Sequence, residues 1–594
     1  MDPPLNPLIT FAVGAEFASR KKLKIACLAA AIKGMYEFDT NRSESNRYNI
    51  KCKVPECNFK LHATSVGGSS TFRVKISVPT HNCFGLNHRG HAQATVSFLA
   101  DYLQDKISEK PKYSPIDIVS DIRRELGVEI SYSKAYRAKE RALQNINGTH
   151  QDAYAQLPQY CEDILKTNPG STAILETDPD TQKFTRIFIS FGASASGIAY
   201  CQPIMGLDGT HLKHKYGGIL LAATSVDGNG CLFPVAHAIV DQENDENWLW
   251  FLRILHNIIQ TNAPEFINTG CLVLISDRQK GLLDGVETVF PNNPHGYCLR
   301  HLEENFHKQF KNSDLKSLLW TAARAINKED YEKALEDMYT ISPKSVDWLL
   351  SHIQPVHWAE IYFPRRRYGH LTSNITESLN AWILEARELP ILAMLEWIRH
   401  QLMKWFAERR VSEAKAQGLL VNKIALEIQT LITTRSCRYR YLQSTDTIYE
   451  VQSGETLQDY LVNLETRSCS CRLWQSHGYL CSHALAIILS LKEDPQVYAE
   501  TFYTLESYHK VYQHAIIHPL TLDYSQPLLY QEINEQSEEE DEGNVVLPPS
   551  TKWPPGHPSK HRIPSKIRPL QCIIHCSRCG EAGHNKKKCT EPLA

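Results

Sequence analysis

The chain of 594 residues contains no run of about 18 apolar residues, the minimum expected of a helix that crosses a bilayer. Its first residues, MDPPLNPLITFAVGAEF, lack a basic segment followed by an apolar one, so we expect no secretory signal there. No internal repeat is evident. These absences argue against a membrane partner and against secretion.

The chain also lacks a large net charge of either sign, because 64 basic residues nearly balance 66 acidic ones, leaving −2. The balance hides a strong segregation of charge. Residues 535–542, EQSEEEDE, are almost all acidic, whereas residues 551–594 contain nine Lys or Arg against two Glu. A basic segment of this kind indicates local contact with a polyanion.

A chain of this length is too long to fold around a single hydrophobic core, so several domains are expected. From about residue 184 strands dominate, in FTRIFISFG, PIMGLD, GGILLAATSV and CLFPVAHAIV, and DGNG at 227–230 predicts a hairpin. An aromatic-rich helix, a short buried strand CLVLISD and a helix near Gln279 follow. This order predicts an α/β fold, a mixed sheet with helices on its faces.

Residues 91–150 show helical patterns, with SPIDIVSDIRRELG and SYSKAYRAKERALQ on either side of GVEI. The two helices fit a helix-turn-helix, and equally a spacer that only packs against its neighbours.

Seventeen cysteines in a chain without a secretory signal favour metal binding over disulfides. Twelve Cys and His residues fall into three sets of four with the spacing of tetrahedral zinc sites. The three sets are Cys52, Cys57, His81 and Cys83; Cys469, Cys471, Cys481 and His483; and Cys576, Cys579, His584 and Cys589. His477 could compete in the second set, but the spacing favours His483.

The third set, in CSRCGEAGHNKKKC, is a C-x2-C-x4-H-x4-C zinc knuckle, a pattern typical of single-stranded nucleic-acid binding. Its Lys586, Lys587 and Lys588 are placed to contact phosphates. The basic segment before it is only weakly similar to minor-groove-binding arms, because the Gly-Arg-Pro core is absent.

Asp208 and Asp277 each follow an apolar strand pattern, and Glu377 lies in a helical pattern, TSNITESLNAWI. Carboxylates from several elements can together hold two Mg²⁺ ions across a scissile phosphate. Each residue also has a simpler interpretation: Asp208 as a turn, Asp277 as a helix cap, and Glu377 as the acid of a capping box with Asn374. Other acids in range are Asp227, Asp241, Glu243 and Glu246.

The stretches LDGTHLK, PVAHAIVDQENDENWLWFL, LISDRQKG, YCLRHLEENF and SNITESLNAW resemble the transposases of Mutator-like elements. The order of an N-terminal zinc module, a central domain, a SWIM-type zinc finger and a terminal CCHC knuckle is similar to that family along nearly the whole chain. The N-terminal module resembles the WRKY-like fingers of these transposases, here ending in Cys83.

The resemblance implies a ribonuclease-H-like core with an Asp-Asp-Glu triad that binds Mg²⁺ or Mn²⁺, carried by Asp208, Asp277 and Glu377. It also places the family's C-x2-H signature at Cys298 and His301, for which DNA positioning or core support is expected rather than catalysis, and simple burial is an alternative. Candidate phosphate contacts, or else a solvated face, are Arg278, Lys280, Arg365, Arg366 and Arg367.

The predicted organisation places small zinc modules around the catalytic core. The segments are a WRKY-like zinc module at 1–90; a helical region at 91–150; the catalytic core at 155–301 and 373–400, with a helical insertion at 302–372; a helical segment at 401–440; a SWIM-type finger at 441–495; an acidic linker at 526–550; and a basic tail with the knuckle at 551–594.

The function predicted from this resemblance is a nuclear, metal-dependent DNA transposase. Its partners are double-stranded DNA at the element's terminal inverted repeats, target DNA, a possible single-stranded nucleic acid at the knuckle, and further copies of itself. One alternative is a domesticated relative that regulates transcription without catalysis. Another, an RNA-binding knuckle protein, rests on residues 576–589 alone.

Overall fold

A computed structural model describes most of the chain, and all described residues lie in one compact unit, Met1–Ser550. The described residues are 11–83, 91–110, 113–147, 149–372, 374–412, 418–435, 439–454, 458–518 and 546–549, without the side chains of 147, 374–377 and 435. The predicted knuckle, with Cys576, Cys579, His584, Cys589 and Lys586 to Lys588, lies outside them, as does most of the predicted acidic linker.

The N-terminal module is a five-stranded antiparallel sheet with one helix, in the order β1-β5-β4-β3-β2. Its elements are β1 (Glu16–Phe17), α1 (Arg20–Lys33), β2 (Phe38–Ser43), β3 (Arg47–Cys52), β4 (Lys60–Ser65) and β5 (Phe72–Val78). Ser19 caps α1 by accepting a hydrogen bond from the backbone N–H of Lys22 at 3.2 Å. Leu23 of α1, Tyr48 and Val74 form its core.

Three helices follow, α2 (Val96–Glu109), α3 (Pro115–Leu126) and α4 (Tyr132–Asn147). Ser114 and Asp117 form a reciprocal capping box at the start of α3, and Gly127 ends it with a left-handed φ of 70°. The predicted helices on either side of GVEI are confirmed, and α2 adds a third helix whose Leu99 and Leu103 pack with Ile118 and Ile122 of α3.

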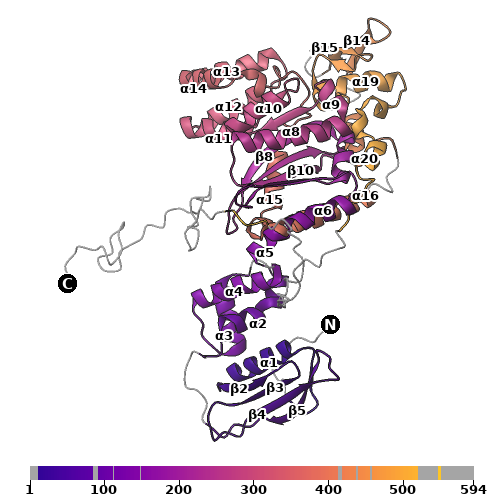
Figure 1. Cartoon of the computed structure of the whole chain (residues 1–594). Coiled ribbons are helices and arrows are strands. Elements are labelled where there is room, and N and C mark those ends of the chain that lie inside the picture. Colours follow the sequence, from indigo (N-terminus) through magenta and orange to yellow (C-terminus); the bar gives the residue numbers. More distant parts are fainter. Residues whose placement is uncertain are drawn as a thin grey trace, which may run out of the picture. The chain divides into compact units, whose positions relative to one another are not determined.

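The central domain contains a mixed seven-stranded sheet in the order β12-β11-β8-β9-β10-β7-β6. Two of its strands, β8 and β10, are labelled in Figure 1. Its strands are β6 (Thr172–Thr177), β7 (Phe184–Ser190), β8 (Gln202–His211), β9 (Ile219–Val226), β10 (Leu232–Val240), β11 (Val273–Ser276) and β12 (His295–Tyr297). The predicted hairpin joins β9 and β10 antiparallel. Strand β11 is parallel to both of its neighbours, β8 and β12.

Helices cover this sheet and close its core. They are α5 (His150–Ala155), α6 (Leu157–Thr167), α7 (Gly192–Gly197), α8 (Asp245–Asn262), α9 (Pro264–Asn268), α10 (Lys280–Val289) and α15 (Asn374–Trp382). Trp248, Leu252 and Leu255 of α8 are fully buried together with Leu207 and Leu274 of the sheet. Helix α15 lies against β8 and β9.

Between the second predicted acid and α15, the chain folds into a helical unit with its own core. Its helices are α11 (Leu299–Phe310), α12 (Ser313–Arg324), α13 (Lys328–Ile341) and α14 (Pro343–His352). Leu302, Leu319, Met338 and Leu349 fill that core. A helical insertion is therefore present in this part of the chain, as expected. Its bounds as a domain, 302–372, stay a prediction.

The remaining described chain consists of long helices, a small four-stranded sheet and the helices around it. The elements are α16 (Ile391–Ser412), α17 (Asn422–Arg435), β13 (Tyr439–Gln443), β14 (Ile448–Ser453), β15 (Asp459–Asn463), β16 (Ser468–Cys469), α18 (Leu473–His477), α19 (Ser482–Ser490) and α20 (Leu505–Val511). Among the described helices, none combines the length and the apolar character of a membrane span. The predicted α/β class with a mixed sheet and small cysteine-bearing modules is confirmed.

We expect Leu252→Ala to destabilise the central domain by about 2–5 kcal/mol, because it removes a fully buried side chain that fills the space beside Gly285. Arg253→Ala, at the neighbouring exposed position of α8, is the matched control and should change stability by less than about 0.5 kcal/mol. The urea midpoint, followed by tryptophan fluorescence, measures both. Equal midpoints for the two variants would contradict the packing described here.

Candidate functional site

The first predicted metal set is gathered at one end of the N-terminal sheet. Cys52 is the last residue of β3, and His81 and Cys83 follow β5. The four ligand atoms all lie within 4.8 Å of one another. Cys52 Sγ and Cys83 Sγ are 3.7 Å apart, and Cys57 Sγ lies 3.4 Å from His81 Nδ1. These separations fit a tetrahedron whose metal–sulfur bonds are about 2.3 Å long.

Aromatic rings hold the histidine of this cluster in place. The His81 ring stacks on Phe59 with 4.3 Å between the centroids and contacts Tyr36 at 4.0 Å. Burial lowers the pKa of His81, which favours the neutral imidazole that binds a metal. The donor set therefore suits zinc.

The second predicted set, Cys469, Cys471, Cys481 and His483, meets the same geometric criterion. Cys469 Sγ is 3.6 Å from His483 Nδ1, and the His483 ring stacks on Tyr460 at 3.9 Å. Hydrogen bonds with Cys469 and Cys481 lower the pKa of the Cys471 thiol, so the cluster favours a thiolate. His477 instead places Nδ1 3.1 Å from the carbonyl oxygen of Leu473, in its own helix. The choice of His483 over His477 agrees with this arrangement.

The two predicted aspartates lie side by side. Strands β8 and β11 are parallel, and Leu207 is in register with Ser276, so Asp208 and Asp277 are the next pair along the two strands. The sequence predicts that Asp208 ends its strand, and this is wrong, because β8 continues to His211. Asp208 lies within β8, pairs with Ala222 of β9 and is not in a turn. The turn interpretation of Asp208 is therefore wrong.

Each aspartate accepts hydrogen bonds that fix its carboxylate. Asp208 accepts from Asn380 Nδ2 at 2.8 Å and from the backbone N–H of Gly209 at 3.0 Å. Asp277 accepts from the backbone N–H of Gln279 at 3.1 Å. Helix α10 is capped by Gln279, whose side chain accepts from the Leu282 N–H, so Asp277 is not the capping residue. Asp208, on β8, and Asp277, directly after β11, are thus each held by hydrogen bonds beside the end of β11.

Burial raises the pKa of Asp208 to about 7, and the charge of Asp277 adds to this effect. His301, the Gly209 N–H and Asn380 oppose it without cancelling it. A buried carboxylate beside a second one favours either a bound proton or a bound cation. The pair therefore favours uptake of a proton or of a cation.

Glu377, the predicted third acid, lies in the first turn of α15, and its side chain is outside the described residues. Position 377 is three residues before Asn380, so the two positions share a helix face. Asn380 contacts Asp208, which places this part of α15 beside the aspartate pair.

Cys298 and His301 lie beside the aspartates. The backbone N–H of Cys298 donates to the carbonyl oxygen of Ser276 at 2.7 Å, which fixes the start of α11 at the end of β11. Hydrogen bonding to Cys298 raises the pKa of His301 to about 9, against the effect of burial, and the charges of Asp277 and Asp208 raise it further. His301 is thus a cationic neighbour of the carboxylate pair.

A further carboxylate, Glu243, reaches the same place. A Cβ atom on residue 209 would lie only 2.9 Å from Glu243 Oε1. The glycine at this position therefore leaves room for the Glu243 carboxylate. Trp248 Nε1 donates to Glu243 at 3.2 Å, and burial raises the pKa of Glu243, as does the charge of Asp277. The sequence marked Glu243 only as one of four acids in range, since nothing in its spacing distinguishes it.

The other three acids in range have structural roles. Asp227 is buried and accepts from Tyr512 at 2.7 Å, Asp241 accepts from Asn247, and Glu246 pairs with Arg186. Of this group of four, only Glu243 interacts with the aspartate pair.

The predicted phosphate contacts are placed differently from one another. Arg367 is 1% exposed and pairs with Glu360 at 2.8 Å, so this arginine supports the core and is unavailable to phosphate. Arg366 pairs with Glu500, and Arg365 donates to the Thr269 carbonyl oxygen. Arg278 donates to the carbonyl oxygen of His352 at 3.4 Å.

We expect Asp208→Asn to stabilise the protein at pH 8 in magnesium-free buffer, by about 2–4 kcal/mol at most. Because the folded-state pKa of about 7 lies above the unfolded value, wild-type stability declines as the pH rises from about 4 to 7. The variant has no such titration, so its advantage should vanish near pH 4. Asp284→Asn, an exposed aspartate of α10, is the control. Urea midpoints that change in parallel with pH for both variants would contradict the expectation.

Three family models match the chain. One described as MULE transposase domain matches residues 204–305, one described as SWIM zinc finger matches residues 460–492, and one described as MuDR family transposase matches residues 9–74. The first covers both aspartates, Glu243, Cys298 and His301, and the second covers the whole second metal cluster.

Curated relatives from Arabidopsis thaliana are distant. Protein FAR-RED IMPAIRED RESPONSE 1 is 21% identical over 435 residues, covering 64% of this chain and 51% of that protein. Protein FAR1-RELATED SEQUENCE 6 is 20% identical over 381 residues, covering 57% and 53%. The chain thus spans about half the length of these two relatives. This chain contains, from its N-terminus on, a MuDR-family transposase segment, a MULE transposase domain and a SWIM zinc finger. This is the order expected from its resemblance to the Mutator-like transposases.

Proposed function

We propose that the chain is a DNA transposase that binds the terminal inverted repeats of a mobile element and performs metal-dependent strand cleavage and transfer. The observation that supports this most is the carboxylate cluster on β8 and β11 within the region matched by the MULE transposase model. The reaction class is phosphodiester cleavage followed by attack of a DNA 3′-hydroxyl on target DNA.

The core is proposed to be ribonuclease-H-like. Three antiparallel strands, β8 to β10, are followed by α8, the parallel strand β11, α10 and the parallel strand β12. The resulting order β10-β9-β8-β11-β12 is the one expected of such a core, with β6 and β7 added at the β10 edge. This topology supports the proposal because it places the end of β11, and with it Asp277, beside Asp208 of β8.

Asp208, Asp277 and Glu377 are proposed to hold the metal ions, with Glu243 as an additional carboxylate. When bound, two Mg²⁺ or Mn²⁺ ions would activate the attacking oxygen and stabilise the leaving oxygen. Asn380 fixes the orientation of Asp208, and the Gln279 N–H fixes that of Asp277. His301 contributes positive charge where a phosphodiester would approach, which is the DNA-positioning role anticipated for the C-x2-H signature.

DNA recognition is assigned to the N-terminal module. The MuDR-family match covers residues 9–74, and the adjoining Cys52–Cys57–His81–Cys83 cluster suits a structural zinc ion. Zinc is also proposed for the SWIM-type finger and for the C-terminal knuckle, which makes three sites. Residence in the nucleus is proposed from the DNA substrate and the basic clusters, and assembly into a multimer from the resemblance to the Mutator-like transposases.

A second candidate function is a DNA-binding regulator without catalysis, derived from a transposase. The curated relatives favour it, because their names refer to an impaired far-red response and to related sequences. The retained carboxylate cluster favours the transposase. Terminal inverted repeats and target-site duplications around the gene would distinguish a mobile element from a domesticated one.

We expect the full chain to bind three zinc ions and the Cys52→Ser variant to bind one fewer. The variant should also lose specific DNA binding, because three remaining ligands hold zinc, and with it the N-terminal module, poorly. Cys231→Ser changes an exposed cysteine outside both clusters and should keep both properties. Elemental analysis counts zinc, and a mobility shift with the element ends measures binding. A Cys52→Ser protein with full zinc content would refute the ligand assignment.

We expect Asp208→Asn, Asp277→Asn and Glu377→Gln each to lower Mg²⁺-dependent cleavage of the element ends by about 100-fold or more, because each removes a metal ligand. Glu243→Gln should reduce cleavage by less, about 10- to 100-fold, as typical of a residue that supports the ligands. Asp284→Asn is again the control. Specific binding by the wild type without any cleavage, unchanged by these substitutions, would favour the regulator.

A further inference from the structure

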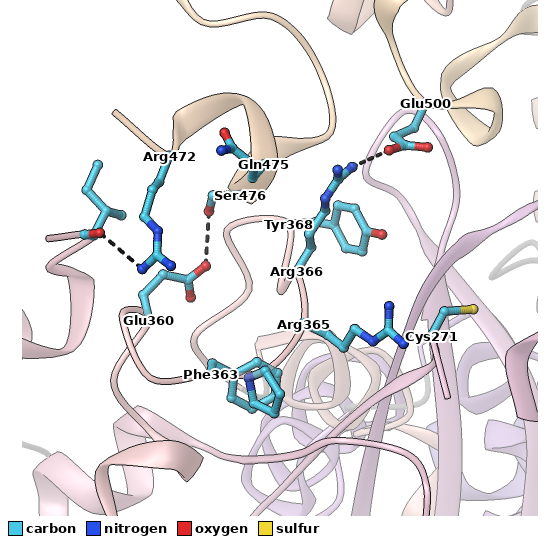
Figure 2. A pocket seen from close by; sticks show the side chains of 12 residues that line it. Cys271, Glu360, Phe363, Arg365, Arg366, Tyr368, Arg472, Gln475, Ser476 and Glu500 are labelled. Atoms are coloured by element: carbon cyan, nitrogen blue, oxygen red, sulfur yellow. Dashed lines mark hydrogen bonds and ion pairs between the residues drawn. The ribbon is translucent and has the colours of Figure 1, made fainter. Parts of the chain in front are cut away.

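A pocket of about 460 Å³ lies between the SWIM-type finger and the segment that follows α14 (Figure 2). Arg472, Gln475 and Ser476 come from the finger, and Arg365 and Tyr368 come from the other wall. The volume is within the range of sites that bind small groups.

This pocket is distinct from the carboxylate cluster. Cys271, which lines it, precedes β11, whereas Asp277 follows the same strand. Six residues of extended chain at about 3.3 Å each place them roughly 20 Å apart. A ligand here therefore does not touch the reacting atoms.

Positive charge in the pocket exceeds negative charge. Arg366 is neutralised by Glu500. Arg365 donates to the carbonyl oxygen of Thr269 at 2.9 Å, and Arg472 to that of Ile361 at 3.3 Å. Within the described part of the chain, neither Arg365 nor Arg472 forms an ion pair with a carboxylate.

Glu360, the other acid at the pocket, is already occupied. It accepts from the buried Arg367 at 2.8 Å. It also accepts from Ser476 Oγ at 3.0 Å, as Figure 2 shows. Its charge is thus compensated by Arg367, and in the described part of the chain no ion pair joins Glu360 to Arg365 or Arg472. Two guanidinium groups remain as donors for an anion.

Two residues on opposite walls adopt strained backbone conformations. Tyr368 has a φ of 49° and Arg472 a φ of 59°, both in the left-handed region that residues with a Cβ seldom adopt. Strain of this kind concentrates at ligand-binding positions, where surrounding contacts hold it. Here the two strained residues face one pocket.

We propose that this pocket binds a phosphate group of the DNA backbone. Guanidinium groups match the geometry of phosphate oxygens, and the pocket offers one from each wall. The inference rests on the proposed DNA function, because it takes DNA as the ligand, but it concerns a contact remote from catalysis. A free nucleotide or inorganic phosphate has the same chemistry, so the test includes both.

The first experiment uses the native thiol of Cys271 as a reporter in the full chain. N-ethylmaleimide alkylation of Cys271 is followed by peptide mass spectrometry with and without duplex DNA, and Cys231, an exposed cysteine of the β9–β10 hairpin, is the internal control. We expect DNA to slow alkylation of Cys271 several-fold and to leave Cys231 unchanged. ATP and inorganic phosphate, at the same phosphate concentration, should protect neither cysteine.

The second experiment compares Arg365→Gln/Arg472→Gln with Arg253→Gln, which changes an exposed arginine of α8. The double variant should lose the protection of Cys271, and the slope of log affinity against log salt should fall by about 1, as expected for one lost phosphate contact. The control should keep both. Arg365→Gln alone, which gives up one hydrogen bond to a carbonyl oxygen, serves if the double variant does not fold.

DNA that is bound in the mobility shift while Cys271 remains unprotected would overturn this inference and leave the proposed function intact. Protection that persists in the double variant would also overturn it. Protection by inorganic phosphate or ATP without DNA would replace it with a small-anion site. Failure of the full chain to bind any DNA would overturn the proposed function, and the inference with it.

Discussion

The parallel pairing of β8 with β11 is the constraint on which the candidate site depends. It places Asp208 and Asp277 as neighbours, and Asp208 is only 9% exposed, so their repulsion is poorly screened. Two unit charges about 4 Å apart repel by about 4 kcal/mol at an effective dielectric constant of 20. Asn380, the Gly209 N–H and His301 offset part of this repulsion, and a divalent cation bound between the two carboxylates would relieve the remainder.

The helices around the pair arrive from distant parts of the chain, yet each is positioned by a short-range contact. The Cys298 N–H bonded to Ser276 fixes the start of α11, and Asn380 bonded to Asp208 fixes α15. The helical unit between them has its own core, so it can occupy the chain between the second and third acids without disturbing the sheet. A long sequence separation is therefore compatible with a compact site.

Short-range patterns in the sequence were sufficient for the zinc clusters and the β9–β10 hairpin, because the ligands or turn residues lie close together in the chain. The carboxylate pair needed family resemblance, since a local pattern cannot distinguish a turn from a strand that continues past Asp208. Glu243 and the burial of Arg367 were not predictable: the position of Glu243 depends on the space left by Gly209, and the burial of Arg367 depends on its ion pair with Glu360.

The SWIM-type finger positions one of the arginines that line the pocket. Cys471, a ligand of its metal cluster, is followed directly by Arg472, whose left-handed backbone turns the chain into α18. A zinc ion bound by Cys471 would therefore also limit where the Arg472 guanidinium can lie. Ser476, one turn later, bonds to Glu360 on the opposite wall. A structural zinc ion at this cluster would thus preorganise the positive charge of Arg472 and reduce the entropy lost when an anion binds.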